Sequence, residues 1–86
     1  MDEYEVVLSR SARKELEALP DAIQDRVLAR VVSLTQNPRP TGCRKLAGSD
    51  SLWRLRVGDY RVLFGIDDRV RLIDIVAVRH RSDAYR

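Results

Sequence analysis

The hydrophobic positions near the start of the chain suit first a strand and then a helix. Residues 4–8 are rich in β-forming side chains and predict a short strand. Apolar residues separated by three or four positions then predict a helix, namely Ala12, Leu16 and Leu19. Ser9 or Ser11 would cap the start of this helix, and Pro20 would end it.

A second helical stripe begins directly after Pro20. Asp21, followed three positions later by Gln24, resembles a capping box and predicts the start of the helix. The apolar residues repeat at helical spacing, namely Ile23, Val27, Val31 and Leu34, widened by Leu28 and Val32. Asn37 and Pro38 end the pattern. Because the break at Pro20 is short, we expect an antiparallel helical hairpin.

After a loop over residues 38–50, which contains Pro and Gly, the hydrophobic period changes to two. Residues 52–57 and 60–66 alternate between apolar and polar side chains on either side of a Gly58-Asp59 turn. This pattern predicts a β-hairpin with a two-residue loop.

Asp67-Asp68 marks a further turn, and residues 70–78 predict a nearly continuous apolar strand. The order β-α-α-β-β-β predicts an α+β fold with an antiparallel sheet, in which the last three strands form a meander. The helical hairpin should cover one face of that sheet. The length favours a single domain over residues 1–86.

The predicted hairpin places its side chains on two opposite faces. The apolar face should pack on the helices and comprises Trp53, Leu55, Val57, Tyr60, Val62 and Phe64. The other face carries Arg54, Arg56 and Arg61, with Arg56 directly opposite Arg61. Like charges in this position destabilise a strand pair, so a functional role is expected here. The alternative is that acidic neighbours, such as Asp74, neutralise the arginines.

Charge is distributed unevenly along the chain. Residues 1–37 carry five basic and seven acidic side chains, a net charge of −2, whereas residues 38–86 carry eleven basic and six acidic ones, a net charge of +5. Ten of those eleven are Arg, and only Lys45 is Lys. The planar guanidinium matches phosphate oxygens, which favours a phosphate-bearing partner over a merely solvated basic surface.

Several classes of protein are disfavoured by composition. No apolar run approaches the ~20 residues of a membrane span, and the acidic N-terminus does not suit a signal or transit peptide. One cysteine, Cys43, cannot form an internal disulfide, which favours a cytoplasmic location. With one Cys and one His, a structural metal site is not expected. The sequence contains no Gly-rich phosphate loop, and no cofactor is expected. The single histidine, His80, excludes a two-histidine ribonuclease mechanism within one chain.

Two segments resemble the RelE/ParE superfamily of toxins from toxin–antitoxin pairs. They are residues 45–48 (KLAG) and 52–64 (LWRLRVGDYRVLF). The ending over residues 80–85 (HRSDAY) and the Leu19-Pro20 break are also similar to that superfamily. The resemblance covers essentially the whole chain. It implies a toxin with a cognate antitoxin protein as partner, in a complex that binds operator DNA.

The two branches of that superfamily imply different activities. RelE-type toxins are ribosome-dependent messenger-RNA endonucleases that need no metal, and ParE-type toxins inhibit DNA gyrase. The arginine set and the late tyrosine favour the first activity, with the ribosome and mRNA as partners. Gyrase inhibition without nuclease activity is the alternative.

The resemblance also implies a set of site residues. The catalytic ones are Arg61, Arg81, Tyr85 and Arg56, and the RNA-binding ones are Arg54, Lys45 and Arg79. Arg61 and Arg81 would clamp the scissile phosphate, with Arg79 as the alternative to Arg81. Tyr85 would stack on a base, orient the nucleophile or accept its proton. Positions 54 and 56 hold Arg where familiar RelE toxins have Lys, and an Arg side chain stays protonated and cannot act as a base.

Overall fold

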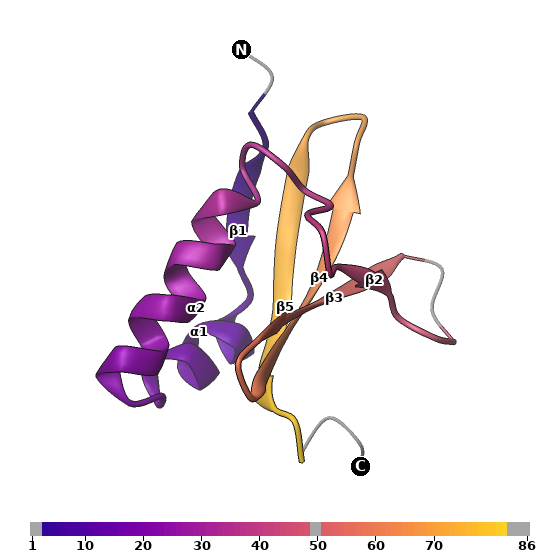
Figure 1. The fold of residues 1–86 in the computed structure, drawn as a ribbon. Helices are drawn as coiled ribbons and strands as arrows, with labels where there is room; N and C mark the ends of the chain where they lie inside the picture. The colour runs from indigo at the N-terminus through magenta and orange to yellow at the C-terminus, as the bar shows by residue number, and fades with distance from the viewer. Residues whose placement is uncertain (1–2, 49–50, 83–86) are drawn as a thin grey trace.

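Two helices lie on one face of a five-stranded sheet, as Figure 1 shows for the computed structural model. The structure describes residues 3–48 and 51–82. In chain order the elements are β1 (Glu5–Leu8), α1 (Arg10–Glu17), α2 (Asp21–Ser33), β2 (Arg44–Lys45), β3 (Leu52–Val57), β4 (Tyr60–Asp67) and β5 (Leu72–His80). The predicted α+β class and helical hairpin are confirmed. Neither described helix is long and apolar enough to cross a membrane.

The two helices begin in different ways. The Ser9 hydroxyl accepts a hydrogen bond from the Ala12 N–H at 3.1 Å, so Ser9 rather than Ser11 caps α1. The capping box predicted for α2 is wrong, because Pro20 occupies the N-cap position and no side chain caps that helix. Asp21 lies inside the first turn instead, where its carboxylate faces the positive end of the helix dipole.

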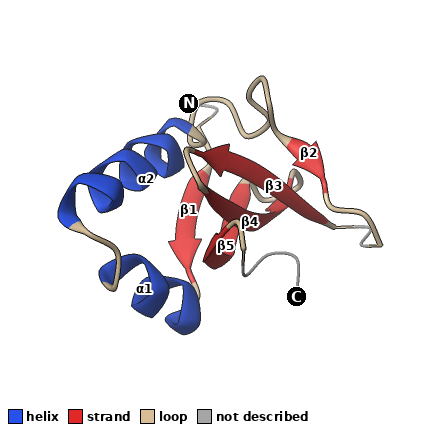
Figure 2. Ribbon diagram, turned by 60° about the horizontal axis from the view of Figure 1, so that its bottom comes forward, coloured by secondary structure: helices blue, strands red, loops and turns tan. Residues whose placement is uncertain are grey.

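The sheet is mixed, with the strand order β1-β5-β4-β3-β2 (Figure 2). The meander of β3, β4 and β5 is antiparallel as predicted, but β1 pairs with β5 in parallel, so a wholly antiparallel sheet was wrong. Parallel pairing requires a long connection, and both helices and the rest of the sheet separate these two strands in the chain. The prediction also missed β2, which pairs with β3 at the other edge.

The predicted hairpin register is confirmed, including the direct pairing of Arg56 with Arg61. On the next strand Arg61 pairs with Arg79, and a β-bulge interrupts the pairing of β4 with β5 at Leu63 and Phe64. Strand β5 runs to His80 rather than ending at residue 78, so Arg79 belongs to the sheet and not to the tail. Pairing between strands therefore aligns three arginines across β3, β4 and β5.

The core lies between the helices and the apolar face of the sheet. Its largest fully buried side chains are Phe64, Leu34, Leu55, Ile73, Ile75, Val27 and Val62. This confirms the predicted sheet face and the central stripe of the second helix. The expected widening of that stripe by Leu28 and Val32 is wrong, because both side chains are exposed. Trp53 is only half-buried, and the Arg39 guanidinium lies 5.1 Å from the centroid of its ring.

Side chains of the first helix and its cap cover the edge of β5 that β1 leaves open. Strand β1 reaches only as far as Ile75 in its pairing. Beyond that point the Ser9 hydroxyl donates to the Val76 carbonyl at 3.3 Å, and the Glu15 carboxylate accepts from the Val78 N–H at 2.8 Å. These bonds replace those of a missing strand partner, and they fix α1 against the half of β5 that carries Arg79.

A polar cluster joins the N-terminus, the loop after α2 and the β4–β5 turn. Asp68 accepts a hydrogen bond from the Tyr4 hydroxyl at 2.6 Å, and it accepts two from the Arg39 guanidinium, at 2.9 and 3.2 Å. These bonds, led by those from Arg39, hold the pKa of Asp68 below its usual value. The cluster anchors the start of the loop that leads to β2.

Candidate functional site

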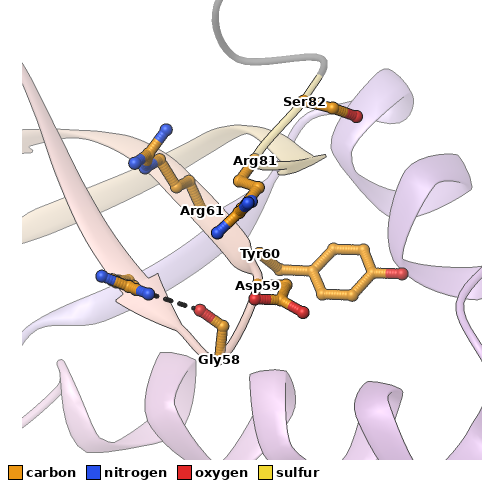
Figure 3. Close-up of a pocket in the computed structure, with 7 residues that line it drawn as sticks. Gly58, Asp59, Tyr60, Arg61, Arg81 and Ser82 are labelled. Carbon is orange, nitrogen blue, oxygen red and sulfur yellow. Dashed lines mark hydrogen bonds between the residues drawn. The ribbon is translucent and has the colours of Figure 1, made fainter.

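The β3–β4 turn and the end of β5 enclose an open hollow of about 450 Å³ (Figure 3). Its lining comprises Arg56, Gly58, Asp59, Tyr60, Arg61, Arg81 and Ser82. Three arginines from three different segments thus line one site. Asp59 is the one acidic residue of this lining among the residues that the structure describes. Such a concentration of forked cationic donors suits a phosphate group.

The turn itself holds two of these arginines. Gly58 has a φ of 60°, a left-handed conformation that glycine adopts without steric cost. Its carbonyl accepts a hydrogen bond from Arg56 Nε at 3.1 Å, and the Asp59 carbonyl accepts one from the main-chain N–H of Arg81 at 2.7 Å. The backbone of the turn therefore binds the side chain of Arg56 directly. For Arg81 it binds the main chain of the segment that carries the side chain.

A second hollow, of about 260 Å³, adjoins the first on the same sheet face. Its lining comprises Gly42, Arg44, Arg54, Arg56 and Arg61. Arg44 pairs directly with Arg54 in the sheet, as Arg56 does with Arg61. We call the surface formed by Arg44, Arg54, Arg56, Arg61 and Arg81 the arginine face.

The alternative explanation of the arginine face, neutralisation by Asp74, is wrong. Asp74 pairs with Gly65, four positions along β4 from Arg61. Within the described part of the chain, no carboxylate forms an ion pair with Arg54 or Arg56. The like-charge pairs therefore cost folding free energy, and no ion pair among the described residues offsets that cost at Arg54 or Arg56.

The structure distinguishes Arg79 from Arg81. Arg79 belongs to the cross-strand row of arginines, but its Nε donates to Glu15 Oε2 at 3.1 Å, and it does not line either hollow. Arg81 lines the first hollow together with Arg56 and Arg61. The geometry therefore brings Arg81, and not Arg79, to the site.

One further predicted residue, Lys45, lies away from the described site. Lys45 pairs with Trp53, so the alternation of side chains places it on the opposite sheet face from its neighbour Arg44. Arg44, which the sequence reasoning missed, takes the place on the arginine face. The only signal for it was the strand pairing of a two-residue segment. Tyr85 lies outside the described residues.

His80 contributes to the site indirectly. Its ring meets that of Tyr60 edge to face, with centroids 5.2 Å apart and planes at 85°. Its Nδ1 accepts a hydrogen bond from the Ser82 N–H at 3.3 Å and lies 3.0 Å from the Ser82 hydroxyl. These contacts order the chain on both sides of Arg81. The single cysteine, Cys43, lies in the loop after α2, and burial raises the pKa of its thiol.

Comparison with known proteins places these features in a family. The family model described as the ParE toxin of the type II toxin–antitoxin system, parDE, matches residues 6–85. The chain is 38% identical over 91 residues to toxin RelG of Mycobacterium tuberculosis, covering 96% of this chain and 97% of that protein. It is 32% identical over 84 residues to toxin RelE of the same organism, covering 96% and 87%.

The fold agrees with the same grouping. The archaeal RelE–RelB complex from Pyrococcus horikoshii contains a chain that matches with a TM-score of 0.82 and 31% identity, covering 94% of this chain and 97% of that one. These matches extend over the helices, the sheet and the arginine face together. The chain belongs to the ParE toxin family, within the RelE/ParE superfamily of type II toxin–antitoxin systems.

Proposed function

We propose that this toxin is a ribosome-dependent messenger-RNA endonuclease that inhibits translation. The observation that carries the proposal is the convergence of Arg56, Arg61 and Arg81 on one open hollow. RNA cleavage without a metal needs concentrated positive charge where the phosphate gains negative charge, and fixed guanidinium groups supply it. The names of the curated relatives, toxin RelE and toxin RelG, favour the same branch of the superfamily.

The proposed reaction is an in-line attack of a ribose 2′-hydroxyl on its own 3′ phosphate. A bond forms between the 2′ oxygen and phosphorus, and the bond from phosphorus to the 5′ oxygen of the next nucleotide breaks. The products are a 2′,3′-cyclic phosphate and a free 5′-hydroxyl. The 2′-hydroxyl gives its proton to an acceptor, and the leaving 5′ oxygen takes one up.

Each arginine has a distinct task in this proposal. Arg61 and Arg81 clamp the scissile phosphate and stabilise the charge of the pentacoordinate transition state. Arg56, held by the turn carbonyl, supports them, while Arg44 and Arg54 bind the neighbouring backbone. Arginine stays protonated, so none of these residues accepts the proton. The ribosome would supply much of the orientation of the substrate.

We further propose a cognate antitoxin as partner, by analogy with the RelE–RelB complex of P. horikoshii. The antitoxin complex would bind operator DNA. Gyrase inhibition is the second candidate function, and the ParE description of the matching family model favours it. A non-nuclease inhibitor would leave RNA intact and would not need the three arginines to share one phosphate.

One pair of assays separates the two candidates. The purified chain is incubated with ribosomes and mRNA, and the cut ends are mapped; a gyrase supercoiling assay runs beside it. We expect cuts that require ribosomes and no effect on supercoiling. Inhibition of gyrase with intact mRNA would overturn the nuclease proposal and establish the second candidate.

A further inference from the structure

A third hollow lies on the helix side of the β3–β4 hairpin. It measures about 320 Å³, and its lining comprises Arg26, Ala29, Arg30, Arg56, Val57 and Gly58. Figure 2 shows the end of β3, which leads into the turn, beside α2. Arg56 lines this hollow as well as both hollows of the arginine face. The three cavities therefore share one guanidinium, at the strand edge where the two sides of the hairpin meet.

Arg26 lies close against the turn. A Cβ atom placed on Gly58 would lie 3.4 Å from Arg26 Nη2 and 3.7 Å from Nη1. A side chain at position 58 would thus meet this guanidinium at ordinary van der Waals distance, and its main cost would be the strain of its φ of 60°. The guanidinium of Arg26 therefore lies directly over the turn.

The arrangement on α2 also costs stability. Arg26 and Arg30 are four residues apart on one helix, a spacing at which like charges repel. Within residues 3–48 and 51–82, no carboxylate forms an ion pair with either side chain. Together with Arg56 they place three cations around this hollow, and an acidic residue, Asp59, lines a smaller hollow that adjoins it at Arg26. A local cost without a folding benefit indicates a binding role.

We propose that this hollow binds the phosphate backbone of the same single-stranded RNA, beyond the nucleotide that is cut. The proposal rests on the proposed function. The RNA would leave the arginine face past Arg56, turn around the edge of the hairpin and reach Arg26 and Arg30. Continuity through Arg56 favours one extended polyanion over a separate acidic protein segment, because the same side chain lines all three cavities.

The test compares RNA oligonucleotides of two lengths. Both are fully 2′-O-methylated, which prevents cleavage: one has three nucleotides and the other has nine. Binding to the purified chain is measured by fluorescence anisotropy between 50 and 200 mM salt. The variant is Arg26→Gln/Arg30→Gln, which keeps much of the side-chain stem, and the control is Arg10→Gln/Arg13→Gln. The control removes the same charge from two exposed positions of α1.

We expect the variant to bind the nine-nucleotide RNA about tenfold more weakly than the unsubstituted chain does. The slope of log affinity against log salt should fall in magnitude by about 1.4, because each lost phosphate contact on single-stranded RNA contributes about 0.7. Affinity for the three-nucleotide RNA should stay within about twofold, and the control should change neither value by more than that.

Three outcomes would overturn the inference. The first is equal affinity of variant and control for the long RNA, and the second is no binding of that RNA by the unsubstituted chain at 50 mM salt. The third is a variant that no longer binds a nine-residue polyglutamate peptide, which the unsubstituted chain binds, but still binds RNA normally. That result would assign the hollow to an acidic protein segment. The ribosome cleavage assay tests the proposed function separately. If the unsubstituted chain cuts mRNA on ribosomes but the variant binds the long RNA as tightly as the unsubstituted chain does, only this inference is refuted.

Discussion

The main-chain N–H of Arg81 donates a hydrogen bond of 2.7 Å to the carbonyl oxygen of Asp59. This bond ties the chain just after the last strand to the turn between β3 and β4. The neighbouring carbonyl of the same turn, that of Gly58, accepts from Arg56 Nε. A two-residue turn thus sets the relative positions of two arginines that are 25 residues apart in sequence. Fixed donors of this kind need little reorganisation during a reaction.

Arg61→Ala should lower the cleavage rate on ribosomes by about 100- to 1000-fold, the cost of losing one oriented donor to transition-state charge. The fold should survive, because the side chain belongs to the arginine face and not to the buried core. Arg69→Ala is the matched control, since Arg69 is exposed in the β4–β5 turn. If mapping of the RNA ends shows that Arg61→Ala cleaves as fast as the unsubstituted chain, Arg61 does not belong to the phosphate clamp.

The two C-terminal arginines should differ in their effects on catalysis. Arg81→Ala should lower the single-turnover rate on ribosomes by ~100-fold or more, whereas Arg79→Ala should lower it by less than about tenfold. The reason is that Arg81 lines the hollow and Arg79 is paired with Glu15. A larger loss for Arg79→Ala than for Arg81→Ala would reverse this assignment.

Glu15→Ala should destabilise the fold by about 1–3 kcal/mol, because it leaves the N–H of Val78 without an acceptor at a position that is only 4% exposed. Glu15→Gln should cost less, since an amide oxygen can still accept that bond, and the ion pair with Arg79 is exposed and contributes at most ~1 kcal/mol. Guanidinium unfolding of both variants measures the difference. Equal losses would show that charge, and not the edge hydrogen bond, makes the contribution.

The cluster around Asp68 should make stability depend on pH. Its pKa in the folded protein is lowered, first by Arg39 and then by Tyr4, so the ionised carboxylate stabilises the fold above the pKa of the unfolded chain. This contribution is lost as the pH falls through the folded-state pKa. The stability difference between the chain and Asp68→Asn should therefore be constant near neutral pH and shrink below about pH 4. Urea unfolding across pH 3–7 checks this, and a constant difference would contradict it.

Tyr85 can be tested although it lies outside the described residues. If its ring stacks on a base, Tyr85→Phe should be mild and Tyr85→Ala severe, since such stacking is worth about 1–3 kcal/mol. If its hydroxyl orients the nucleophile, Tyr85→Phe alone should slow cleavage while ribosome binding stays intact. Single-turnover cleavage at saturating ribosome concentration separates these roles. Unchanged rates in both variants would exclude the residue from the site.

The hairpin was the most predictable part of the chain. A two-residue turn and strict alternation determine the register, and a slip of one residue would move every apolar side chain to the wrong face. That register already identified Arg54, Arg56 and Arg61 as neighbours on one face, which is the centre of the candidate site.

Other parts of the site depend on contacts that leave no periodic signal. Strand β2 has two residues, too few to show a period, so Arg44 was missed. The apolar residues of β5 form a nearly continuous run, which hides both the end of the strand and the β-bulge. The choice of Arg81 over Arg79 depends on a hydrogen bond to a distant turn and on an ion pair with α1. Tertiary contacts of this kind cannot be read from spacing along the chain.

The β-bulge determines the side of the sheet on which the chain ends its last strand. Phe64 pairs with Ile75 but Leu63 pairs with Ala77, so Val76 is the additional residue. Before it, odd-numbered residues of β5 point into the core, and after it they point to the opposite face. Without this additional residue, Arg79 would project toward the helices and Val78 would replace it beside Arg61. A single inserted residue therefore separates the apolar from the charged side chains of β5, and Arg79 lies on the same side of the sheet as Arg61 because of it.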